Sequence, residues 1–256
     1  MNMKNCRNLL LAAAVLAAAS SCSDKVQVKG TLAGAPDTQV VVKQLSGSTL
    51  LTLDTLKTDA SGAYSCKIDV LKGQPQFVYL FKGDTKIASL LLQKGDKVKV
   101  ASDTLGKYSV EGSEESEKLR QVEEDFAAFI DKFSADAAAG DNAAASKDYI
   151  EYYRGCVKYI MTNSKSLTSI PVLYQKVNES FPIFSQATDA ILFQNVHDSL
   201  MTVYPESKYL EALKKEAEKR FNIFNLSQRV QNARESSYPD LNLPSVDGTK
   251  VKLLEI

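Results

Sequence analysis

The hydrophobic pattern of this chain changes its period once, at Gly112-Ser113, and no other feature constrains the fold as strongly. Before this point, apolar and polar residues alternate over short runs that are separated by turn-forming clusters. After it, apolar residues recur at every third or fourth position. Alternation is typical of half-buried strands, and the longer spacing is typical of amphipathic helices. The sequence therefore predicts an α+β, multi-domain chain in which a strand-rich part precedes a helical part.

Eight strands are expected in the first part. They lie near residues 26–28, 40–45, 50–58, 63–70, 76–81, 87–92, 97–100 and 107–110. Turn-forming clusters such as Lys82-Gly83-Asp84 stand between them, because glycine and aspartate favour tight turns. Short strands with hairpin-length connections predict an antiparallel β sandwich or a barrel-like domain, which we assign to residues 22–112.

Five amphipathic helices are expected in the second part, which we assign to residues 113–230 as a helical bundle. Ser113 is a suitable N-cap for the first helix, and the acidic residues after it suit a helix N-terminus. A loop is expected at 136–145. The later helices are expected at about 146–161, after 166–171, at 188–204 and at 206–224. The inward residues of the last helix are expected to be Tyr209, Leu213, Ala217, Phe221 and Phe224.

The last residues, 238–256, predict a small β-hairpin. Pro239 favours an extended conformation at Tyr238, and Asp247-Gly248 is a hairpin-turn dipeptide followed by alternating lysine and apolar residues. An isolated hairpin is marginal in water. This segment is therefore expected to join a sheet.

The pattern Pro239-Asp240-x-x-Leu243-Pro244-x-x-Asp247-Gly248-x-x-Val251-x-Leu253 resembles the entry hairpin of TlpA/ResA-like thioredoxin-fold thiol-disulfide oxidoreductases, which are related to peroxiredoxins of the AhpC/TSA type. The resemblance implies that residues 231–256 are a linker and the truncated start of a thioredoxin-like domain. It also implies a Cys-x-x-Cys further along a parent protein, which this sequence does not contain. The residues before it would then be an anchor and a partner-selecting platform.

The strand-rich part resembles a domain of unknown function that precedes thioredoxin-fold modules in Bacteroides-type envelope lipoproteins. The matching residues are Val28-x-Gly30, Asp59-x-x-Gly62-x-Tyr64 and Leu92-x-x-Gly95-Asp96-x-Val98-x-Val100. No catalytic residue is attached to that domain, so the resemblance implies none here.

The N-terminus, residues 1–21, reads as a signal peptide. Lys4 and Arg7 precede an apolar run that is too short to span the hydrocarbon core of a bilayer, about 30 Å thick. The run ends in Ala19-Ser20-Ser21-Cys22, which resembles a lipobox, with Ala19 where the family usually has leucine. The resemblance implies lipidation at Cys22 and a lipid anchor in the bacterial cell envelope, most simply at the outer membrane facing the periplasm. The alternative is a secreted protein that is cut near Ser21.

Composition and motifs exclude several classes of function. The chain has 31 basic and 31 acidic residues, so its net charge favours neither nucleic acid nor acidic lipid as a partner. His197 is the only histidine, which excludes multi-histidine metal centres, and no P-loop, dinucleotide fingerprint or nucleophile elbow occurs. We therefore predict no metal, no cofactor and no catalytic residue. The acidic pairs at 114–115 and 123–125 are interpreted as solvated helix faces.

The remaining candidates are thiols and aromatic residues. Cys66 and Cys156 are expected to be small core residues, and His197 a partly buried structural histidine. A ligand groove lined by tyrosines is a further possibility, although aromatic residues at helical spacing more often belong to a core. The tyrosines concerned are Tyr152, Tyr153, Tyr159 and Tyr204.

Two functions follow from the sequence. The first is the lipid-anchored N-terminal portion of a thioredoxin-like thiol-disulfide oxidoreductase. The second is a non-enzymatic envelope lipoprotein that binds a protein or cell-wall partner through its β domain or a helical groove. An independent hydrolase ranks last, because no nucleophile and base can be paired.

Overall fold

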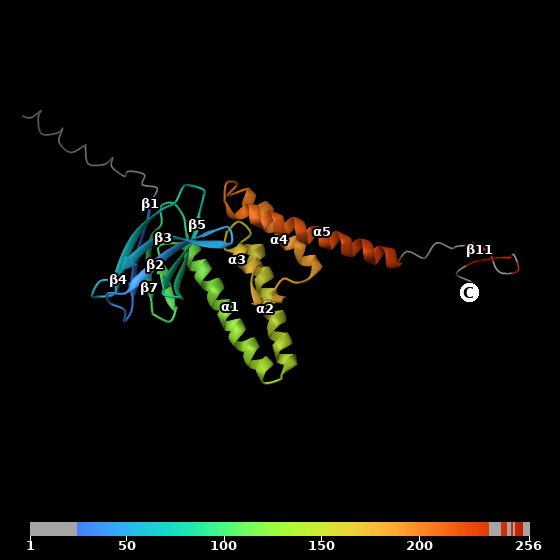
Figure 1. Cartoon of the computed structure of the whole chain (residues 1–256), viewed down its shortest axis with the longest axis horizontal. Helices are drawn as coiled ribbons and strands as arrows, with labels where there is room; N and C mark the ends of the chain where they lie inside the picture. The colour runs from blue at the N-terminus through green and yellow to red at the C-terminus, as the bar shows by residue number, and fades with distance from the viewer. Residues whose placement is uncertain (1–24, 236–241, 245–246, 248, 253–256) are drawn as a thin grey trace, which may run out of the picture.

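The computed structural model describes residues 25–235, 242–244, 247 and 249–252 (Figure 1). These residues form an α+β fold of two mainly antiparallel sheets and a set of helices, so the predicted class is confirmed. The first sheet contains, in order, β4 (Ala63–Asp69), β1 (Lys25–Leu32), β7 (Lys97–Ser102) and β8 (Tyr108–Glu111). The second sheet contains β3 (Thr49–Lys57), β2 (Gln39–Ser46), β5 (Gln76–Lys82) and β6 (Thr85–Leu92).

All eight strands expected in the first part are present, and in β1, β4 and β7 buried and outward side chains alternate as predicted. In β1, Val26 and Val28 are fully buried, whereas Lys25 and Lys29 point outward. The expectation of purely antiparallel pairing was wrong at one place, because β1 and β7 pair in parallel. Parallel neighbours need a long crossover, and the whole second sheet lies between these two strands in the chain.

Two hydrophobic cores lie on the two sides of the second sheet. Val78 and Leu90 point toward the first sheet and belong to the core between the sheets. Phe77 and Leu91 point the other way and share a core with the helices. The described part of the chain is therefore layered as first sheet, second sheet and helices.

The helices are α1 (Glu114–Ala138), α2 (Asn142–Thr162), α3 (Ser169–Leu173), α4 (Ala190–Met201) and α5 (Tyr209–Glu235), with a short 3-10 turn at Ala187–Asp189. The predicted cap is confirmed: Ser113 Oγ accepts a hydrogen bond from the Ser116 amide at 3.3 Å. No helix in the described part of the chain combines the length and the apolar character that crossing a bilayer needs.

Three expectations about the helical part were wrong. The loop predicted at 136–145 is only a short break, because Asp141 caps α2 by accepting from the Ala144 amide at 2.9 Å. The third helix is a single turn, and the chain then forms a small hairpin of β9 (Lys176–Asn178) and β10 (Phe181–Pro182).

The third error concerns the last helix, α5. It runs to Glu235 rather than to about residue 224, and it extends past the other helices (Figure 1). Tyr209, Leu213 and Ala217 are buried as expected, but Phe221 is 39% exposed, because the other helices no longer cover α5 there. Beyond α5, β11 (Asn242–Pro244) and β12 (Lys250–Lys252) pair antiparallel with each other, as the predicted hairpin requires.

Candidate functional site

The structure describes two of the three candidate thiols. Cys22, the predicted lipidation site, lies outside the described residues. Cys66 and Cys156 are buried, one in each core, and both are free. Burial raises the pKa of each thiol to about 11. Both thiols are therefore protonated at neutral pH, so neither has the thiolate that thiol-disulfide exchange requires.

In the first sheet, the residues that carry the family resemblance have structural roles. Tyr64 pairs with Gly30 across β4 and β1, and its ring occupies the space where a side chain at Gly30 would lie. Asp59 shapes the preceding turn, because its Oδ1 accepts hydrogen bonds from the amides of Ser61 and Ala63. Gly62 has a φ of +81°, which favours glycine. The geometry of this turn and of this strand pair therefore explains why these residue types occur in the motif.

The sequence predicted that the acidic residues at 114–115 and 123–125 face solvent, but not all of them do. Glu123 accepts hydrogen bonds from Lys86 at 2.6 Å, from Ser89 at 2.8 Å and from Tyr108 at 3.1 Å. It therefore joins α1 to strands of both sheets. The interpretation of 123–125 as a solvated face was wrong for this residue. Sequence alone could not show it, because the partners lie on distant strands. His197 is partly buried, as predicted, with Nδ1 2.9 Å from a carboxylate oxygen of Asp198.

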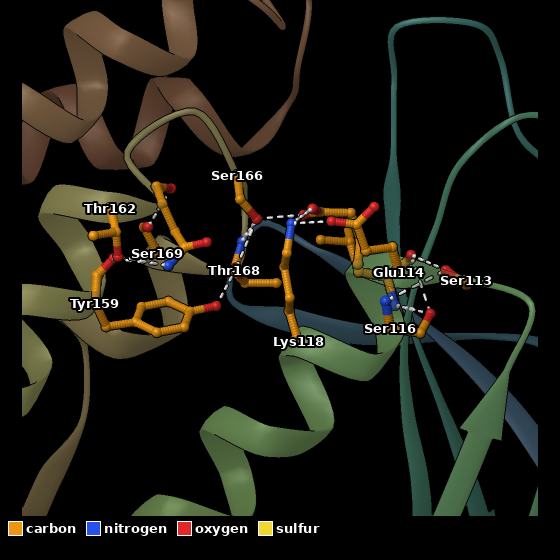
Figure 2. Close-up of polar contacts among 12 residues, drawn as sticks. Ser113, Glu114, Ser116, Lys118, Tyr159, Thr162, Ser166, Thr168 and Ser169 are labelled. Atoms are coloured by element: carbon orange, nitrogen blue, oxygen red, sulfur yellow. Dashed lines mark hydrogen bonds and ion pairs between the residues drawn. The ribbon is translucent and has the colours of Figure 1, made fainter.

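A second polar cluster joins the start of α1 to β6 and to the loop before α3 (Figure 2). Ser116 Oγ accepts from the Leu91 amide at 3.0 Å and donates to the Leu91 carbonyl at 3.2 Å. Glu115 accepts from Ser166, and Ser166 also contacts Thr168. These groups satisfy one another and include no histidine, so the cluster is a structural joint between sheet and helices.

The tyrosines at 152, 153, 159 and 204 pack on the helical core, which was the favoured interpretation, and they do not form the ligand groove that was the alternative. Tyr152, Tyr153 and Tyr159 bond to polar side chains of the helical part, and Tyr204 is half-buried in the same core. Tyr152 and Tyr159 line only a small cavity of about 250 Å³. Their main role is packing.

A larger apolar groove, which we call the aromatic groove, lies between the second sheet and two helices. Its volume is about 480 Å³. It is lined by Leu45, Gly47, Ser48, Phe77, Tyr79, Ile170, Pro171, Tyr174, Lys208, Tyr209, Ala212 and Leu213. The residues come from β2 and the turn after it, β5, α3 with the residue after it, and α5 with the residue before it, so no single motif could have revealed the groove.

Tyr209 fixes the floor of the groove. Its hydroxyl accepts a hydrogen bond from the Phe77 amide at 2.9 Å and donates to the Leu45 carbonyl at 3.4 Å. The rings of Phe77 and Tyr209 meet edge to face, with centroids 5.0 Å apart. These contacts hold α5 against β2 and β5, so the groove is preformed.

Lys208 is the charged residue at the rim. Its Nζ lies 5.3 Å from the centroid of the Tyr209 ring. Partial burial lowers the pKa of Lys208, because desolvation disfavours the ammonium. No ion pair of Lys208 occurs among the described residues. The groove thus combines an apolar body with one cationic group.

Comparison with known proteins does not assign the site. No protein-family model matches the chain, and a search of curated proteins finds no match. Within the described residues, no group of three or more histidine, cysteine or acidic side chains is placed to hold a metal ion.

Proposed function

We propose that this chain is a lipid-anchored protein of the cell envelope whose described part is a binding module. Its finer architecture is a β sandwich that carries a helical bundle, and Cys22 supplies the anchor. The aromatic groove is the observation that carries the proposal, because it is apolar, preformed and of a size usual for small-molecule sites, roughly 300–1,000 Å³.

The chemistry of the groove selects an amphipathic anion as its ligand. Phe77, Tyr79 and Tyr174 offer flat apolar surface to a hydrocarbon or aromatic body. Lys208, which is partly desolvated, gains a counter-charge when an anionic head group lies at the rim. An alkyl or aromatic carboxylate or sulfonate fits both requirements.

The change that tests this proposal is Ala212→Trp. Ala212 lines the groove from the exposed side of α5, so an indole there fills the groove without removing a core residue. We expect binding of the fluorescent anion anilinonaphthalene sulfonate to weaken by tenfold or more. Fluorescence titration measures it, and decanoate is expected to displace the probe better than decanol does.

Two further variants make the result specific. Lys219→Trp adds the same indole to an exposed position of α5 that does not line the groove, and it should bind the probe as the parent does. Lys208→Gln should abolish the preference for decanoate over decanol. Equal binding by the parent and Ala212→Trp would refute the groove as the site. Displacement by an apolar peptide but not by decanoate would refute the ligand class.

The second candidate is the N-terminal portion of a thioredoxin-like thiol-disulfide oxidoreductase. The observation in its favour is that β11 and β12 form a two-stranded sheet of their own. Such a pair suits the entry hairpin of a further domain, since two strands alone are marginal. The module would be held at the membrane by Cys22, and the described part would select its partner in the envelope.

The coding DNA tests this second candidate directly. Reading past codon 256 is expected to reveal a Cys-x-x-Cys within about one further strand and helix. A stop codon directly after Ile256, together with a mature mass ending at that residue, would refute it. Neither result bears on the groove, which the two candidates share.

A further inference from the structure

The outward face of the first sheet carries a concentration of positive charge. Because side chains alternate along a strand, Lys25, Lys29, Lys67, Lys97 and Lys99 all project from the side that faces away from the core. We call these five residues the lysine face. They are neighbours across strands: Lys29 lies beside Lys99, and Gln27 lies between Lys67 and Lys97.

The charge on this face departs from that of the whole chain. The outward acidic residues on its strands are Asp69, which is 3.8 Å from Lys25, and Glu111, which lies opposite Lys99. Five lysines therefore meet two acids here, although the full chain has 31 residues of each sign. The neutral composition had predicted no attraction to acidic lipid, but composition cannot show where charges lie. Lys29, Lys67, Lys97 and Lys99 make no ion pair with the described residues.

The shape of the face suits contact with a surface. A shallow hollow of about 750 Å³ lies over the middle of the sheet, lined in part by Lys29, Thr31, Ser65 and Lys99, with Lys57, Asp59 and Glu111 also in its lining. These outward side chains are polar. The face is thus suited to electrostatic contact with head groups rather than to insertion into hydrocarbon.

The covalent chain limits how far this sheet can be from an anchor at Cys22. Three residue steps separate Cys22 from Lys25, where β1 begins, and an extended chain spans at most about 3.6 Å per residue. β1 would therefore start within about 11 Å of the acylated residue. Charges near the start of β1 would then lie at about the Debye length of physiological salt, about 8–10 Å, so they would still attract charged head groups.

We propose that the lysine face binds the head groups of anionic phospholipids and lays the first sheet against the bilayer. The orientation rests on the proposed anchor at Cys22, whereas the affinity for anionic lipid belongs to the face itself. In this orientation the second sheet and the helices are stacked away from the membrane. The aromatic groove, on the far side of the second sheet, then opens away from the lipid.

Vesicle binding by the mature chain without its acyl groups tests the proposal. The protein begins at residue 22 and carries Cys22→Ser; both cores lie between Val26 and Ala217, so the fold is retained. It is expected to sediment with phosphatidylcholine vesicles that contain phosphatidylglycerol and not with phosphatidylcholine alone. Binding should disappear as salt rises from about 0.1 M to about 1 M.

The decisive variant replaces Lys29, Lys67, Lys97 and Lys99 with glutamine. Each lysine near an anionic surface contributes roughly fivefold to binding, so the combined loss should be several hundredfold. The control replaces four exposed lysines of the helical part with glutamine, which changes the net charge equally and should leave binding within about fivefold of the parent. These control positions are Lys158, Lys165, Lys214 and Lys219.

The outcomes separate this proposal from the proposed anchor. Equal losses in the two lysine variants, or equal binding to neutral and anionic vesicles, would overturn the lysine face as the lipid contact. Incorporation of labelled palmitate in cells, and its loss in Cys22→Ser, tests the anchor independently. Labelling without specific vesicle binding would leave an anchored protein with no lipid-binding face. Vesicle binding without labelling would confirm the lipid affinity of the face and remove the anchor.

Discussion

Gly30→Ala is expected to destabilise the protein by about 3 kcal/mol, although it adds a single methyl group. A Cβ at position 30 would lie 1.9 Å from Cζ of Tyr64. The Tyr64 ring is buried between the sheets, and its hydroxyl lies in the core, so the ring cannot yield by a small rotation. It must leave its site and lose most of its packing. The midpoint of urea unfolding measures the change in the free energy of unfolding.

The same substitution at Gly155 is the control, because no heavy atom lies within 4 Å of a Cβ added there. In the interior of α2, Gly155→Ala should stabilise by about 0.5–1 kcal/mol. If steric conflict with Tyr64 is the cause, Gly30→Ala should cost less than about 1 kcal/mol in a Tyr64→Val background. An undiminished cost in that background would show that the loss arises elsewhere.

The sequence predicted the parts of this fold that depend on neighbouring residues. Alternating or β-branched apolar runs between turn-forming clusters located all eight strands of the two sheets, and Ser113 marked the start of α1, because strands, turns and helix caps leave local patterns. The short α3 and the hairpin after it were missed. Segments of two to five residues hold too few positions to establish a period, and packing decides their conformation.

The candidate sites were harder to predict, because their residues meet only in the folded chain. The aromatic groove combines β2, β5, α3 and α5, whose residues are far apart in sequence. Glu123 looked solvated because its partners lie on β6 and β8. The lysine face had a local signal: its lysines occupy the same alternating phase in β1, β4 and β7. Only the pairing of those strands brings them together.

Phe77→Ala is expected to give the largest loss at the contact between sheet and helices, about 3–5 kcal/mol. Phe77 is 2% exposed, and its ring packs edge to face on Tyr209. The next residue, Val78, belongs to the core between the sheets, so a cavity at Phe77 weakens a strand that both cores share. For a chain of this size the melting temperature should fall by roughly 10 °C or more.

The two buried thiols show whether the cores unfold together. Cys66 reports on the core between the sheets and Cys156 on the helical core, and each reacts with a thiol reagent only after its core opens. Because β5 and β6 contribute side chains to both cores, we expect both thiols to react at the same urea concentration, shifted equally by Phe77→Ala. Leu105→Ala, at a side chain 87% exposed, should shift neither thiol. If Phe77→Ala exposes Cys156 well before Cys66, the sheets are stable without the helices, and the groove between them can open while the first sheet stays folded.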